Sequence, residues 1–78
     1  MAGRIMSNFE WQLNHTGTAW YLTDDRHYSW GSIAIISNES YGVFVRYDRF
    51  EPAKWVAEVN DLGEAKGLVQ TLVGANHV

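Results

Sequence analysis

The sequence predicts an α+β domain in which one C-terminal helix packs on one face of an antiparallel sheet of four to five strands. Two features carry this prediction. Short segments rich in aromatic and β-branched residues alternate with turn residues through most of the chain. A capped amphipathic segment follows the last of them. With 78 residues, the chain is expected to hold a single α+β domain over residues 8–78, preceded by a flexible N-terminal tail at 1–7.

The first two predicted strands form a hairpin. Residues 9–13 alternate apolar side chains with polar ones, a period that is typical of a strand with one buried face. Residues 15–17 end in a glycine and supply the turn. The return strand spans residues 19–23, so these two strands are expected to pair in antiparallel fashion.

Three more strands follow, separated by polar turn segments and by a loop that contains the single proline. They are predicted over residues 28–37, 41–47 and 55–59. Apolar side chains occur at both odd and even positions in these strands, which indicates that both faces of the sheet are apolar. The face beneath the helix is expected to hold Trp11, Leu13, Trp20, Ile33, Val43, Val45 and Trp55. The opposite face is expected to hold Tyr21, Trp30, Ile36, Phe44 and Val56.

The helix is predicted from its cap and its periodicity. Asp61 is a favourable N-cap residue, and Glu64 three positions later completes a capping-box pattern. Apolar residues between Leu62 and Val73 then recur at helical spacing and form one stripe. Gly74 is expected to end the helix, because glycine readily takes the left-handed conformation that follows many helices.

Composition narrows the possible functions. The chain has no cysteine, which excludes disulfides, and no apolar run approaches the roughly 20 residues of a membrane-spanning helix. No apolar leader precedes the first strand, so a cytoplasmic location is expected, in the host cell if the chain is phage-encoded. Nine acidic residues against six basic ones give a net charge of −3, which disfavours binding to nucleic acid or to a membrane surface.

Few residues are candidates for chemistry. Asp24, Asp25 and His27 form the densest ionisable group, and together with His15 they have the side chains of a metal site or of an acid–base pair. Charged residues between two strands are more typical of a solvated loop. We therefore expect no enzymatic activity, no catalytic residue, no metal and no cofactor.

Nucleic-acid binding stays open as an alternative. Arg46, Arg49 and Lys54 lie close together in sequence, and aromatic residues on which bases can stack alternate with them. Asp48 and Glu51 lie within the same stretch and offset its positive charge.

Residues 41–73 resemble the ending of many small single-domain proteins from phages and mobile elements, in which a tryptophan-bearing strand leads into a Leu-x-Glu-Ala-Lys helix start. The matching residues are Trp55–Val59, Leu62, Glu64, Ala65 and Lys66. The resemblance implies an accessory factor. Some proteins of this kind, anti-CRISPR proteins among them, block host defence complexes by covering a surface. The resemblance carries over no functional residue, because the matched positions are structural.

Geometry points to a binding surface as well. One helix, about 10 Å in diameter, covers only about half of a five-stranded sheet that is about 20 Å across. The uncovered apolar face, or an open edge of the sheet, is expected to bind another protein, such as a host complex inhibited by steric occlusion, or a second copy in a structural homodimer. The contact candidates are Tyr21, Trp30, Phe44 and Tyr47, with Asp24, Asp25 and Asp48 as rim charges.

Overall fold

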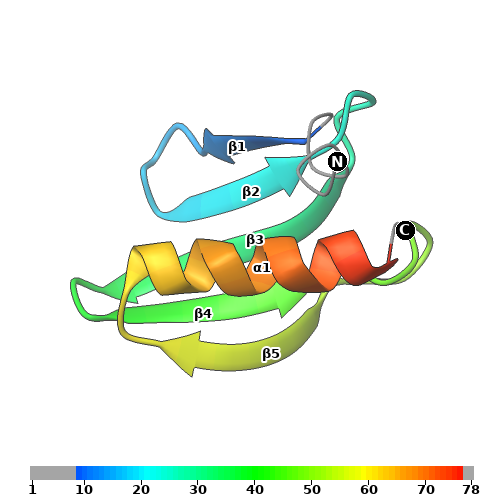
Figure 1. The fold of residues 1–78 in the computed structure, drawn as a ribbon. Coiled ribbons are helices and arrows are strands. Elements are labelled where there is room, and N and C mark those ends of the chain that lie inside the picture. The colour runs from blue at the N-terminus through cyan, green and yellow to red at the C-terminus, as the bar shows by residue number, and fades with distance from the viewer. Residues whose placement is uncertain (1–8, 77–78) are drawn as a thin grey trace.

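The computed structural model, which describes residues 9–76 apart from the side chain of Asn76, has the predicted α+β architecture (Figure 1). Five strands form one sheet in the order β1-β2-β3-β4-β5, and each neighbouring pair is antiparallel. The strands are β1 (Glu10–Leu13), β2 (Ala19–Thr23), β3 (Ser29–Ser37), β4 (Ser40–Val45) and β5 (Lys54–Val59). The tail predicted at residues 1–7 lies outside the described residues.

The helix α1 (Leu62–Asn76) lies on one face of the sheet and contacts β3, β4 and β5 (Figure 1). Asp61 caps it as predicted. Its Oδ2 accepts a hydrogen bond from the Glu64 N–H at 2.9 Å, and its carbonyl accepts one from the Ala65 N–H at 3.0 Å. The first backbone N–H groups of a helix have no hydrogen-bond partner within the helix, and the Asp61 carboxylate supplies a partner for one of them.

The end of the helix differs from the prediction. Gly74 does not stop α1, which continues to Asn76. Among residues 9–76, Gly17 is the glycine with a positive φ, so Gly74 does not adopt the left-handed conformation that ends many helices.

The strand β4 is shorter than predicted and ends at Val45, so Tyr47 lies in the loop that leads to β5. Asp48 begins a turn in this loop. Its Oδ1 accepts a hydrogen bond from the Phe50 N–H at 2.9 Å, and its carbonyl accepts one from the Glu51 N–H at 3.0 Å. These local bonds turn the chain back on itself, so the strand ladder cannot continue along the loop.

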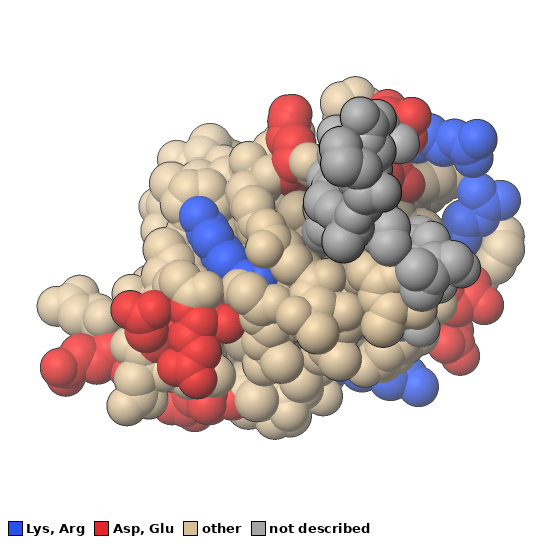
Figure 2. Space-filling model, viewed as in Figure 1, with Lys and Arg blue, Asp and Glu red and all other residues tan. Residues whose placement is uncertain are grey.

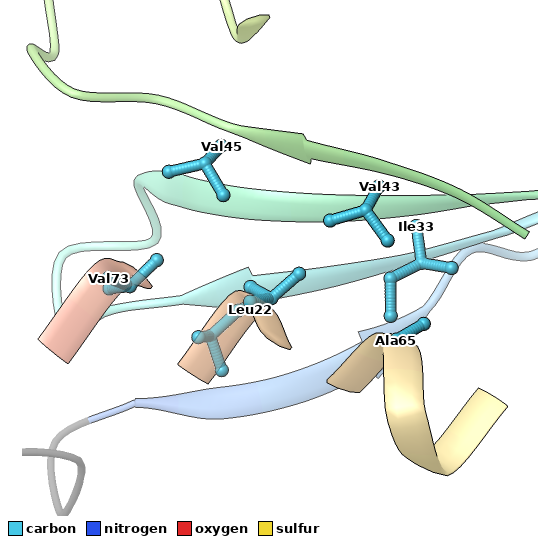
Figure 3. Packing of buried hydrophobic residues seen from close by; sticks show 7 residues of the cluster. Leu22, Ile33, Val43, Val45, Ala65 and Val73 are labelled. Atoms are coloured by element: carbon cyan, nitrogen blue, oxygen red, sulfur yellow. The ribbon is translucent and has the colours of Figure 1, made fainter. Parts of the chain in front are cut away.

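The core lies between α1 and the sheet and consists of aliphatic side chains (Figure 3). Ala65, Val69 and Val73 recur every four residues and therefore lie in one row along α1. The sheet contributes Leu22, Ile33, Val43 and Val45. Aromatic and further aliphatic side chains surround these seven residues, which water does not reach.

Bulges in the sheet change the predicted faces of three side chains. The pairing of β4 with β5 skips Val56, and the pairing of β2 with β3 skips Trp30. Both of these extra residues pack against the core cluster, whereas Trp55 lies on the opposite face. The predicted faces of Trp30, Trp55 and Val56 are therefore wrong, because a bulge breaks the strict alternation that the prediction assumes.

The helix leaves the β1 side of its own face partly uncovered. Lys66 reaches from α1 toward this side, and its Nζ lies 3.9 Å from the centroid of the Trp20 ring and 5.6 Å from that of Trp11. A cation over an indole face is attracted by the negative charge of the ring face. Leu13, predicted beneath the helix, stays exposed because α1 makes its sheet contacts with β3, β4 and β5.

Replacing Gly31 by alanine should destabilise the fold. The helix approaches β3 most closely here, and a Cβ atom at Gly31 would overlap with Cγ1 of Val69. Overpacking of this kind should lower the free energy of unfolding by about 1–3 kcal/mol. Urea unfolding followed by circular dichroism measures the change.

The matched control is Gly67→Ala on the exposed side of α1. No atom lies within 4 Å of a Cβ built there, so the substitution should raise stability by up to about 1 kcal/mol through helix propensity alone. Equal effects of the two substitutions would contradict a close contact between α1 and β3.

Candidate protein-binding surface

The sheet face opposite α1, termed the open face, carries a row of side chains that crosses all five strands. The register places Gln12 opposite Tyr21, Tyr21 opposite Ser32, Ser32 opposite Phe44, and Phe44 opposite Trp55. Residues directly opposite each other in paired strands have side chains on the same face. Three aromatic rings therefore share the open face.

Ile36, Phe44 and Trp55 form a contiguous group, termed the open-face cluster. The Phe44 and Trp55 rings meet edge to face, with centroids 5.5 Å apart and an interplanar angle of 78°. Gly42 lies beneath them, because a Cβ atom there would be 2.9 Å from Trp55 Cζ3, 3.6 Å from Ile36 Cδ1 and 3.6 Å from Phe44 Cε1. Ile36 is 58% exposed and Trp55 is 54% exposed. Much of this apolar surface thus faces solvent.

Within the five strands, the charged side chains on the open face are acidic. Glu10 on β1 and Glu58 on β5 occupy the two outer strands of the sheet. The Ser40 hydroxyl donates a hydrogen bond to Glu58 Oε2. Lys54, the basic residue within the five strands, pairs with the buried Val45 and so lies on the helix side. The open face therefore combines an apolar centre with acidic flanks.

Charge is also unevenly distributed along the strands. On the side that α1 covers, acidic side chains gather where the helix begins, whereas acidic and basic side chains are mixed toward its other end (Figure 2). We term the end where α1 begins the acidic end. Its acidic residues are Glu39, Glu58, Asp61 and Glu64.

A second group of exposed side chains lies at the opposite end, on the β2–β3 and β4–β5 loops. The Arg49 guanidinium carbon lies 5.6 Å from the centroid of the Tyr28 ring and 5.1 Å from that of Phe50. Phe50 is 83% exposed, and Tyr47 in the same loop is exposed as well. We term Tyr28, Tyr47, Arg49 and Phe50 the loop-end cluster.

Asp24, predicted as a rim charge, is instead bonded within the β2–β3 loop. Its Oδ1 accepts hydrogen bonds from the N–H groups of Arg26 at 2.9 Å and Tyr28 at 3.0 Å, and its Oδ2 accepts one from the Trp30 indole N–H at 2.8 Å. Burial alone would raise the pKa of this carboxyl. The hydrogen bond from Trp30, the backbone bonds and the charge of Arg26 outweigh burial, so the pKa of Asp24 lies below its ordinary value.

The residues considered as metal ligands are not brought together. His15 lies in the β1–β2 loop, at the opposite end of β2 from the loop that holds Asp24, Asp25 and His27. His27 takes a left-handed φ of 67° and donates its N–H to the Asp24 carbonyl at 3.0 Å, as a tight hairpin loop requires. Within residues 9–76, no group of three or more His, Asp or Glu residues is placed to hold a metal ion.

The basic residues considered for nucleic-acid binding lie in different surroundings. Arg46 is half-buried, and its Nε is buried without a hydrogen-bond partner among the described residues. Arg49 lies on the rings of the loop-end cluster. Lys54 begins β5 on the helix side. Asp48 and Glu51 belong to the same loop, so acidic charge accompanies the basic charge there.

The predicted contact residues fall into separate groups. Tyr21 and Phe44 lie on the open face, whereas Tyr47 and Asp48 lie in the β4–β5 loop. Trp30 packs against the core, and Asp25 is exposed in the β2–β3 loop. The contact residues predicted from the sequence do not include three exposed apolar residues of the structure, Ile36, Trp55 and Phe50. No sequence pattern indicates the bulge that turns Trp55 outward. An apolar residue in a polar loop, in contrast, indicates an exposed side chain, so Phe50 was predictable.

Comparison with known proteins adds no relative: no protein-family model, curated protein or solved structure matches this chain. Over the part of the chain that the structure describes, no helix has both the length and the apolar character to cross a bilayer. That same part forms no enclosed pocket.

Replacing Asp24 by asparagine should destabilise the fold at neutral pH by about 1 kcal/mol, because both carboxylate oxygens accept hydrogen bonds from N–H groups and the amide NH2 of asparagine can accept none. The folded-state pKa of Asp24 is lowered. Its charge therefore stabilises the fold fully above the unfolded-state pKa of about 3.9, and this contribution is lost as the pH falls through the folded-state pKa. Urea unfolding should show that the difference between wild type and variant shrinks at acidic pH.

Asp25→Asn is the matched control, because Asp25 is the exposed neighbour of Asp24. It should change stability by less than about 0.5 kcal/mol. A destabilisation by Asp24→Asn that is the same at neutral and acidic pH would show that the charge of Asp24 contributes nothing.

Proposed function

We propose that this chain is a non-enzymatic protein-binding module that uses the open face. The observation that carries the proposal is the open-face cluster, in which Ile36 and Trp55 are each more than half exposed on a rigid sheet. Each Å² of apolar surface that a partner removes from water stabilises the complex by about 25 cal/mol. Aromatic side chains held in place before binding also lose little conformational freedom when a partner covers them. Such a surface therefore suits protein recognition.

We further propose that the partner belongs to a host defence complex and that binding blocks this complex by steric occlusion. This step rests on the resemblance of residues 41–73 to small phage and mobile-element proteins. Steric occlusion requires a stable scaffold and a complementary surface, and it requires no catalytic group. A small sheet with one covered face and one open face meets both requirements.

A second candidate function is binding of single-stranded nucleic acid by the loop-end cluster. Arg49 between the Tyr28 and Phe50 rings is the observation that favours it, since bases stack on such groups. The acidic residues of the same two loops oppose it. Fluorescence titration with a labelled oligonucleotide at several salt concentrations separates the two functions, because phosphate contacts make binding weaken steeply as salt rises.

Site-specific photo-crosslinking tests the open face in the intact chain. A photoreactive phenylalanine analogue at Ile36 should form a defined adduct with one partner protein in cells that express the chain. The same analogue at Phe50, in the loop-end cluster, is the control and should form no such adduct. Both positions are more than half exposed, so neither substitution should disturb folding.

Adducts that form at Phe50 and not at Ile36 would contradict the proposal and show that the loop-end cluster is the binding site. An adduct between two copies of the chain at Ile36, together with a dimer mass in light scattering, would replace the proposed function by homodimer formation.

A further inference from the structure

We infer that the open face receives a basic amphipathic helix of the partner, laid along β3 with its apolar side against the sheet. This inference rests on the proposed function, since it specifies what the open face binds. Three observations support it: the distribution of small and large side chains, the placement of charge, and the poor fit of a second copy.

Small side chains run along the middle of the open face and large ones flank them. Ser32 and Ala34 are the open-face residues of β3 that precede Ile36. Tyr21 stands on β2 to one side, and Phe44 stands on β4 to the other. The strands β2 and β4 are two spacings apart, about 9.6 Å, so apolar side chains of a helix about 10 Å in diameter can enter between the two rings while the helix itself rests above them.

The covered face shows that β3 accepts a helix closely. Over Gly31 the side chain of Val69 reaches the β3 backbone, which is possible because glycine has no Cβ atom. On the open face, the small residues of β3 are Ser32 and Ala34, whereas Trp55, Ile36 and Phe44 already cover Gly42 on β4. The apolar side of a helix laid along β3 would meet Ser32 and Ala34 and, beside them, the open-face cluster.

The charges of the open face select a basic helix. Glu10 and Glu58 lie on the outer strands β1 and β5, so one carboxylate flanks each side of a helix placed along β3. Glu39 lies in the β3–β4 turn, at the end of that path. Lysines and arginines on both sides of an apolar stripe would pair with these carboxylates and steer the encounter. The same carboxylates repel nucleic-acid phosphates.

A second copy of the chain fits the open face poorly. Face-to-face pairing would bring like carboxylates into one interface, which is unfavourable. The helix of a second copy has its apolar row buried, and its one basic residue, Lys66, already lies over Trp20.

The test uses a designed helical peptide of about 20 residues, with a leucine and alanine stripe flanked by lysines, and a control peptide in which every lysine is glutamate. Each is titrated into the isotope-labelled chain and followed by NMR. The lysine peptide should shift the signals of Ile36, Phe44 and the Trp55 indole, and the glutamate peptide should shift none of them. Binding should weaken as salt is raised.

Charge variants sharpen the result. The double variant Glu10→Gln with Glu58→Gln keeps hydrogen-bond acceptors at both positions and should weaken binding of the lysine peptide about fivefold. The matched control, Glu51→Gln in the β4–β5 loop, should leave the affinity unchanged. Unfolding curves establish that all variants remain folded.

Three outcomes would overturn the inference: no binding of the lysine peptide, equal binding of the two peptides, or signal shifts confined to the loop-end cluster. None of these outcomes changes the result of cross-linking at Ile36, which tests whether the open face binds a partner at all. The two experiments therefore distinguish a wrong occupant from a wrong binding site. An oligonucleotide that, titrated alone, shifts the Trp55 indole signal would likewise overturn the inference and assign the face to nucleic acid.

Discussion

The row of Ala65, Val69 and Val73 on α1 belongs to one aliphatic cluster with side chains of the sheet, and Val69 lies directly over Gly31 of β3. A chain of 78 residues without disulfides has few other means of stabilising a five-stranded sheet. The helix needs the sheet in return, because its three glycines lower its intrinsic propensity. Each element is therefore stable only with the other, and the arrangement of side chains on the open face depends on the contacts beneath it.

Local signals were sufficient for most of the fold. The first strand, expected over residues 9–13, and the Asp61 cap are each decided by residues close in sequence, and the structure confirms them. The failures have a common origin. The skipped residues Trp30 and Val56 depend on how two strands pair, and the conformation of Gly74 depends on what surrounds the end of α1. Neither is encoded in a short window of sequence.

The sequence predicts that one face of the sheet is apolar and uncovered, but it does not predict every residue on that face. An uncovered apolar face follows from the width of one helix against five strands, and Tyr21 and Phe44 were placed on it from their parity. Trp55 was assigned to the wrong face, although it belongs to the centre of the exposed apolar surface. The contact of Arg49 with Tyr28 joins two loops that are more than 20 residues apart, so only the folded chain reveals it.

The bulge at Val56 has a second effect, on the edge of the sheet. As an outer strand, β5 presents unpaired N–H and C=O groups along one side, and such edges template intermolecular strand addition and aggregation. An incoming strand needs a regular hydrogen-bond spacing, which the extra residue interrupts midway along β5. The other edge, β1, is only four residues long. The chain can thus display apolar rings on a sheet surface while both of its edges resist polymerisation into larger sheets.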